Sequence, residues 1–214
     1  MRMTPMQAAR RLLAASAVST LVAITAAPAF AEAPAANAVR VRGTIVSLDG
    51  ATLNVKSRDG TDVKVTLKDG WKVGSVAKAS LAEIKAGDFV GVAAAPKPDG
   101  SSGALEVLVF PAGMAGTGEG HYPWDLQPNS TMTNATVTNA VTAVDGRKLT
   151  LTYSGGNEKA VSVPENTPVV TFAPAEKSDL VAGATVFVPT QKQADNSLVA
   201  GFVVVGTKGV VPPM

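Results

Sequence analysis

Alternating apolar and polar residues along this chain predict β-strands. The alternation is regular from Val39 to Ile45, and a period of two residues is typical of a strand with one buried face. Asp49-Gly50 and Asp59-Gly60 follow, and both residue types tolerate the positive φ angles that a tight hairpin turn requires. The pattern therefore predicts a meander of three strands between residues 39 and 67.

A short helical turn and two more strands are expected to complete this unit. Ser80 is placed to cap a single turn in "SLAEI" that ends near Gly87. Strands are expected from Phe89 to Ala94 and from Ala104 to Phe110, with a loop rich in Pro, Gly and Ser between them. Five strands with a short helix after the third match the plan of a small OB-like barrel. An open sandwich of five or six strands is the alternative.

The second half of the chain repeats this pattern at a constant offset. "TIVSLDGATLNV" (44–55) aligns with "AVTAVDGRKLTL" (140–151), which places Asp49-Gly50 on Asp145-Gly146, or 145 − 49 = 96 positions later. At that offset about a quarter of the positions from Val41 to Phe110 are identical, which is typical of a duplicated unit. The fold class is therefore expected to be all-β, with two tandem, small, five-stranded OB-like barrel domains.

The pattern also resembles a known group of proteins. The run G-T-I-x-S-x-D-G, then L-x-V, then L-x-x-I-K-A-G-D-x-V-x-V is similar to a broad group of exported bacterial domains of unknown function with an OB-like barrel. In the second copy Asn139 and Ala184 stand where the first has Gly43 and Asp88. The resemblance implies an architecture and a compartment, and no reaction. The residues of the first copy that carry it are Gly43, Thr44, Ile45, Asp49, Gly50, Gly87, Asp88 and Val90.

The start of the chain has the pattern of a secretory signal. Arg2, Arg10 and Arg11 precede an uncharged apolar stretch, and Ala29-Phe30-Ala31 has the small residues of a cleavage site. Cleavage near Ala31 and a periplasmic protein are expected, and an uncleaved N-terminal anchor is the alternative. The expected organisation is a signal peptide (1–31), a flexible mature N-terminus (32–38), domain 1 (39–110), an inter-domain segment (111–136), domain 2 (137–206) and a C-terminal tail (207–214).

Charge and composition exclude several classes of function. The chain has 19 Lys and Arg against 17 Asp and Glu, and three of those arginines precede residue 32, so the remaining chain has 16 basic and 17 acidic residues. This balance and the export signal argue against a nucleic-acid partner. The chain has no cysteine, so disulfides and thiolate metal sites are excluded. After the signal no stretch is long and apolar enough to predict a transmembrane span.

The segment "GTGEGHYPWDL" (116–126) carries the most distinctive side chains. It contains the single histidine of the chain, one of its two tryptophans and one of its two tyrosines. In one interpretation Tyr122 and Trp124 pack between the two domains and fix their angle. In a second, Glu119, His121 and Asp125 hold a divalent transition metal, because one imidazole and two carboxylates suit such an ion. In a third, the loop is exposed and binds an envelope partner.

The remaining candidates point to binding more than to catalysis. Trp71, in "KDGWKVG", is expected in a loop after the third strand, either as a lid over a barrel end or as a ligand-binding residue with Tyr122 and Trp124. One histidine and no cysteine leave few ways to build a nucleophile and its base. We therefore expect an exported, non-enzymatic envelope module that binds a partner or small ligand and needs no cofactor. The alternatives are a metal-binding accessory protein using the His121 segment and, third, a hydrolase with an unrecognised site.

Overall fold

The computed structural model describes residues 37–141 and 147–213, and these residues form an all-β protein. All of them belong to one compact unit. Helical structure in these ranges is limited to single 3₁₀ turns, and none of it is long and apolar enough to cross a bilayer. The expected signal peptide and the expected turn at Asp145-Gly146 lie outside the described residues.

Twelve strands and four 3₁₀ turns follow one another along the described chain. The strands are β1 (Ala38–Asp49), β2 (Thr52–Ser57), β3 (Asp62–Lys78), β4 (Phe89–Pro96), β5 (Ser102–Val109), β6 (Gly120–Pro123), β7 (Thr131–Val141), β8 (Lys148–Tyr153), β9 (Asn157–Ser162), β10 (Val169–Pro174), β11 (Thr185–Lys192) and β12 (Leu198–Gly206). The turns are η1 (Leu81–Glu83), η2 (Ala112–Met114), η3 (Ser154–Gly156) and η4 (Lys177–Asp179).

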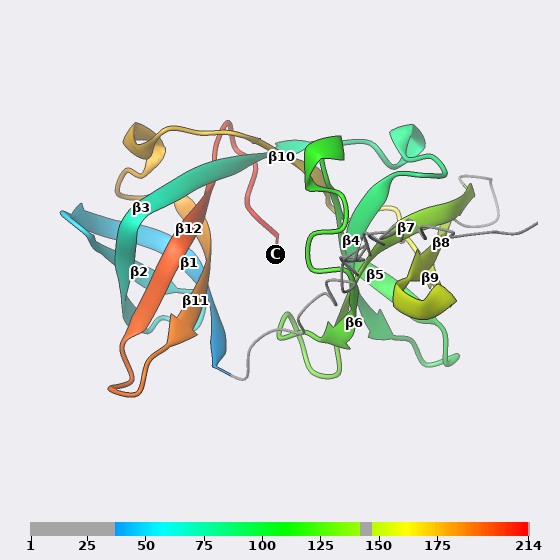
Figure 1. The fold of residues 1–214 in the computed structure, drawn as a ribbon, viewed down its shortest axis with the longest axis horizontal. Helices are drawn as coiled ribbons and strands as arrows, with labels where there is room; N and C mark the ends of the chain where they lie inside the picture. The colour runs from blue at the N-terminus through cyan, green and yellow to red at the C-terminus, as the bar shows by residue number, and fades with distance from the viewer. Residues whose placement is uncertain (1–36, 142–146, 214) are drawn as a thin grey trace, which may run out of the picture. The chain divides into compact units, whose positions relative to one another are not determined.

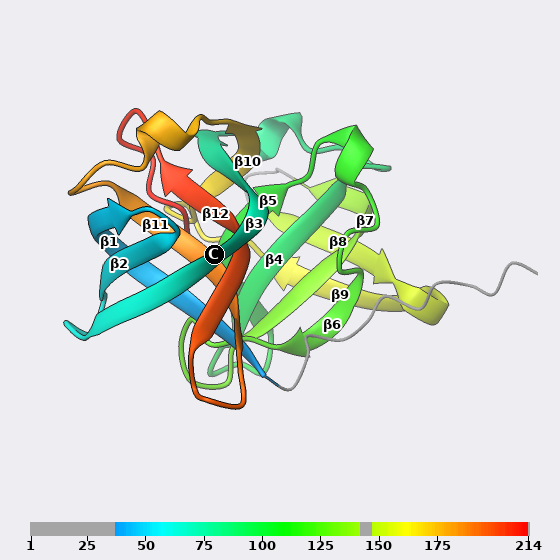
Figure 2. The same ribbon diagram turned by 60° about the vertical axis from the view of Figure 1, so that its left-hand side comes forward.

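Five of these strands, β1, β2, β3, β12 and β11, form a closed barrel. Each is hydrogen-bonded to the next in that order, and β11 returns to β1 with Val41 opposite Val188. The pairing of β12 with β3 is parallel, with Val203 opposite Val73, and Figure 2 shows the two strands side by side. The apolar side chains that point inward form one core, which includes Ile45, Leu53, Val65, Val188 and Val203.

The other strands form a second group around a core of their own. Strands β5, β4, β7, β8 and β9 are paired in that order, and β9 meets β5 again at Ser162 and Gly103. Val92, Val107, Leu149 and Val161 belong to the core of this second strand group. The short strand β6 pairs with the first part of β7. Figure 1 shows the closed barrel and the second strand group, with β3 and β10 running between them.

The strand pairing corrects the expectation that residues 39–110 and 137–206 each close their own barrel. Strands β11 and β12 of the second half complete the closed barrel, and β4 and β5 of the first half pair with β7. The reason lies in β3, which runs through Trp71 where a loop was expected and is 17 residues long. Its last part pairs with β10, so the chain enters the second strand group instead of turning back.

A third apolar cluster lies between the two groups of strands. This central cluster takes residues from β3, β4, β5, β10, β11 and β12 and from Phe110, which directly follows β5; its members are Val76, Phe89, Leu108, Phe110, Val170, Phe187 and Val204. Two of its rings, those of Phe89 and Phe110, meet edge to face with centroids 5.2 Å apart, a favoured geometry for aromatic pairs. Trp124, Phe172 and Phe202 pack against the cluster from its edge. The two groups of strands are therefore joined by buried apolar surface as well as by strand pairing through β3 and β10.

Candidate functional site

The site begins with the two faces of β1. Val39 and Val41 point toward the core of the closed barrel, and because side chains alternate along a strand, Arg40 and Arg42 project to the other side. Their side chains are only 14% and 8% exposed. Two arginines this deeply buried require acceptors close by, and the chain supplies one from the segment after β6.

That segment, residues 124–130, is a short closed loop that we call the arm. The backbone N–H of Trp124 donates to the carbonyl of Ser130. The buried Ser130 hydroxyl also lies 2.9 Å from the carbonyl of Trp124 and 2.7 Å from that of Gln127. Asn129 has a φ of 60°, which asparagine tolerates better than most residues. These contacts fix the two residues at the start of the arm, Trp124 and Asp125.

Trp124 lies under the guanidinium group of Arg40. The Cζ atom of Arg40 is 3.7 Å from the centroid of the indole ring, a geometry that favours a cation–π interaction. The ring also packs against the central cluster and lies 6.1 Å from that of Tyr122. Its Nε1–H is buried and has no acceptor among the described residues.

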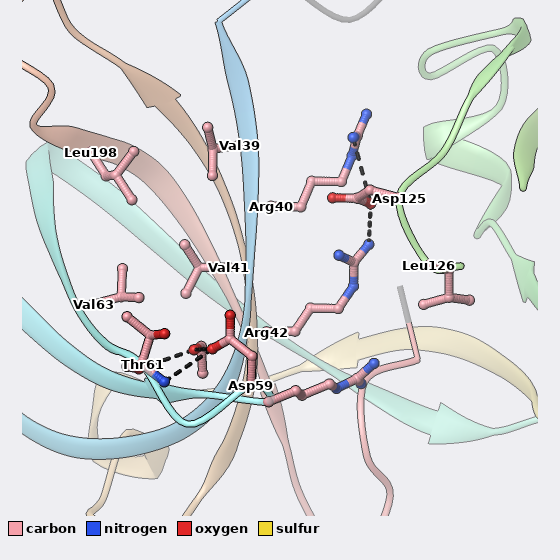
Figure 3. Close-up of a pocket in the computed structure, with 12 residues that line it drawn as sticks. Val39, Arg40, Val41, Arg42, Asp59, Thr61, Val63, Asp125, Leu126 and Leu198 are labelled. Carbon is pink, nitrogen blue, oxygen red and sulfur yellow. Dashed lines mark hydrogen bonds and ion pairs between the residues drawn. The ribbon is translucent and has the colours of Figure 1, made fainter. Parts of the chain in front are cut away.

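Asp125 accepts a hydrogen bond from Arg42 and forms an ion pair with Arg40, the two arginines of β1. Its Oδ1 atom is 2.9 Å from Nη2 of Arg42 and 3.6 Å from Nη1 of Arg40, and Figure 3 shows the carboxylate between the two guanidinium groups. Burial acts to raise the pKa of Asp125, but the hydrogen bond and charge of Arg42, with the charge of Arg40, outweigh it and lower the pKa. The arginine pair therefore already holds one carboxylate of the chain itself.

A pocket of about 450 Å³ opens beside these residues. Arg58 lines it from the turn between β2 and β3, and burial lowers the pKa of this guanidinium, with the charge of Arg42 acting in the same direction. Its one described hydrogen bond is long, 3.4 Å from Nη2 to the carbonyl of Pro212. The carboxylate of Asp59, the next residue in the chain, accepts hydrogen bonds from the Ser57 hydroxyl and from the backbone N–H of Thr61. We call this the arginine pocket; its apolar lining is Val39, Val41, Val63, Leu126 and Leu198.

Glu106, a residue of the second strand group, is an acid whose charge interacts with two of these arginines. It lies on β5, is 1% exposed, and neither carboxylate oxygen has a hydrogen-bond partner among the described residues. Burial raises the pKa of Glu106 to about 7, against the opposing charges of Arg42 and Arg58. This residue was not predicted from the sequence, although one acid in the run "ALEVLVF" (104–110) is a visible anomaly. Arg40 and Arg42 were predicted only as the polar half of an alternating pattern.

The expected metal ligands do not come together. Asp125 is held by arginines, whereas Nδ1 of His121 lies 2.8 Å from the Thr133 hydroxyl and its Nε2 lies 3.5 Å from Nζ of Lys159. Burial lowers the pKa of His121, and the charge of Lys159 lowers it further. Within the described ranges no group of three or more His, Asp or Glu side chains is close enough to hold a metal ion. The proposed set of Glu119, His121 and Asp125 is therefore not formed.

The remaining predicted site residues have structural neighbours. The Tyr122 hydroxyl accepts from Nδ2 of Asn134 at 3.0 Å. Trp71 packs against the core of the closed barrel, with Nζ of Lys177 4.2 Å from its ring centroid. Neither residue lines the arginine pocket. The hydroxyl beside His121 belongs to Thr133, which is fully buried, so this pair does not present a nucleophile to a substrate.

Comparisons with family models, with curated proteins and with solved structures found no match to this chain.

Proposed function

We propose that this protein is a non-enzymatic binding module that takes a small organic carboxylate in the arginine pocket. One observation carries the proposal: Arg58 lies partly buried in a pocket beside two arginines, and the one hydrogen bond that its guanidinium group makes to the described residues is long, 3.4 Å. A guanidinium group has five N–H donors and pairs well with carboxylates. Arg40 and Arg42 already bind a carboxylate, that of Asp125, which indicates the kind of group that suits this surface.

The lining of the pocket supports a ligand with an aliphatic part. Valine and leucine side chains from β1, β3 and β12 also line the pocket, Val39 and Val41 from the face of β1 opposite to Arg40 and Arg42. Its volume of about 450 Å³ lies within the range of small-molecule sites, which are mostly apolar with a few polar groups that fix orientation. A short fatty acid offers both kinds of contact, and hexanoate is a suitable probe.

We also propose that the two groups of strands are OB-like barrels that arose by duplication and exchanged their last two strands. The order β1, β2, β3, β12, β11 is that of a five-stranded OB barrel once β12 and β11 stand for its fifth and fourth strands. Matching pairs in the two groups are 96 residues apart, as the repeat requires: Val199–Thr66 matches Gly103–Ser162, and Val203–Val73 matches Val107–Val169.

For the compartment, we propose export to the periplasm with residues 1–31 as the signal. The support is the sequence alone: the arginines, the uncharged apolar stretch and the Ala29-Phe30-Ala31 site. A carboxylate-binding module with no requirement for nucleotides or thiols is compatible with that compartment.

Calorimetric titration with hexanoate tests the proposed function. The purified protein should bind hexanoate saturably and should not bind hexanol, which lacks the charge. Arg58→Gln should weaken binding about 10- to 100-fold, because a hydrogen bond to a charged group contributes about 1.5–3 kcal/mol. Lys148→Gln, an exposed charge change on β8 of the second strand group, is the matched control and should bind as the wild type does. Equal losses in both variants would contradict the assignment.

A further inference from the structure

Glu106 is a buried acid whose carboxylate has no hydrogen bond to the part of the chain that the structure describes. Its side chain is 1% exposed, and both oxygens are without partners among the described residues. An ionised carboxylate in such a place is unfavourable unless charges nearby compensate for the lost water. The protonation of Glu106 therefore depends on which charges surround it.

Charged groups act on this carboxylate from three elements. Arg42 on β1 and Arg58 in the turn after β2 favour its ionised form, and Asp125 on the arm opposes that form. Its own strand, β5, has no other ionisable side chain, and neither does the neighbouring strand β4. Burial, two cations and one anion thus determine whether Glu106 holds a proton.

Both of those cations belong to the arginine pocket. A carboxylate that docks on Arg58 and Arg42 neutralises the two charges that favour ionised Glu106. It also brings a second negative charge close to a carboxylate that is shielded from water. Like charges in one poorly solvated site raise the proton affinity of the buried acid.

We propose that a carboxylate ligand bound at Arg58 and Arg42 drives the uptake of one proton by Glu106, so that the module takes up an organic acid as its anion together with a proton. The inference rests on the proposed function. No covalent bond of the ligand changes: a proton passes from the solvent to a carboxylate oxygen of Glu106. Since the pKa of Glu106 in the free protein is about 7, neutral to mildly alkaline solution is where the uptake becomes measurable.

Calorimetry in two buffers measures this proton directly. Hexanoate is titrated into the purified protein at pH 8 in Tris and in triethanolamine, which are cationic and do not compete for the arginines. The dependence of the binding heat on the ionisation heat of the buffer gives the number of protons taken up. We expect between about half a proton and one proton for each hexanoate bound, and a Kd that rises about fivefold from pH 7 to pH 8.

Glu106→Gln is the decisive variant, because it keeps the size of the side chain and removes its titration. It should bind hexanoate with no proton uptake and with a Kd that does not change over this range of pH. Glu106→Leu serves the same purpose if the amide variant does not fold. If the wild type binds hexanoate without taking up a proton, the inference is wrong and the proposed function still stands. The same conclusion follows if proton uptake persists in Glu106→Gln. Absence of hexanoate binding to the wild type would overturn both.

Discussion

Replacing Trp124 with alanine should destabilise the protein more than any other change in the segment from 116 to 126. The indole packs against the central cluster and lies 3.7 Å below the Cζ atom of Arg40. Truncation of a fully buried tryptophan costs about 3–5 kcal/mol, and the partial exposure of Trp124 lowers this figure. Loss of the cation–π contact adds about 1 kcal/mol to this cost. Removal of the Nε1–H, which has no acceptor among the described residues, lowers the cost by about the same amount. The net expectation is a loss of about 2–3 kcal/mol.

Thermal unfolding followed by circular dichroism measures this loss. For a chain of this length, 1 kcal/mol corresponds to a shift of about 2–4 °C, so Trp124→Ala should lower the melting temperature by about 5–10 °C. Trp124→Phe, which keeps a ring and removes the unpaired N–H, should lower it by less than half as much. His121→Ala should also have a small effect, because His121 is an exposed residue. A shift below about 2 °C for Trp124→Ala, or one equal to that of His121→Ala, would refute the view that the arm is docked.

Three further predictions follow from the strand pairing and from Glu106. Because each group of strands takes members from both halves of the chain, urea should unfold the protein in one transition with superimposable fluorescence and circular dichroism curves, and two separated transitions would contradict the exchange. The pKa of Glu106 is raised from 4.5 to about 7 in the folded protein. As the pH rises from 4.5 to about 7, the unfolded chain therefore loses this proton before the folded protein does, and the free energy of unfolding falls. Relative to Glu106→Gln, the wild type should lose on the order of 3 kcal/mol in urea unfolding between pH 4 and pH 8, and equal slopes would show that Glu106 is not shifted. A Cβ at Gly43 would overlap the carbonyl of Lys56 on β2, whereas the space around Gly201 on β12 is open. Gly43→Ala should therefore cost more than about 2 kcal/mol and Gly201→Ala much less, and similar costs would argue against the β1–β2 pairing.

Local patterns in the sequence predict most of the strands. The alternation in β1 and the Asp49-Gly50 and Asp59-Gly60 pairs place the first three strands near their positions in the structure. Ser80 caps a 3₁₀ turn, with its hydroxyl accepting from the backbone of Ala82. These features depend on neighbouring residues only, which is why periodicity and turn chemistry are sufficient to find them.

The hydrophobic pattern of each strand does not show which other strand it pairs with. Strands β4 and β11 occupy corresponding places in the repeat and both bury apolar residues, Val90 and Val92 in β4 and Val186 and Val188 in β11, so either one suits either core. What decides between them is the course of β3 after Leu67, where residues 68–71 bulge away from β12 and the strand then continues. The sequence "KDGWKVG" instead suggested a loop after the third strand. Similarly, Arg58 and Glu106 are far apart in sequence and belong to different groups of strands, and the charge of Arg58 acts on Glu106 only in the folded protein.

NMR of the arginine side chains tests most directly whether the arginine pocket binds a carboxylate. Hexanoate is added to ¹⁵N-labelled protein and the Nε–Hε signals are followed for Arg42, Arg58 and Arg147, the last of which bonds the carbonyl of Val163 in the second strand group. Binding in the pocket predicts saturable shifts of the Arg58 and Arg42 signals and an unchanged Arg147 signal. If Arg147 shifts as much as Arg58, or if no arginine signal moves at saturating hexanoate, the pocket is not a carboxylate site.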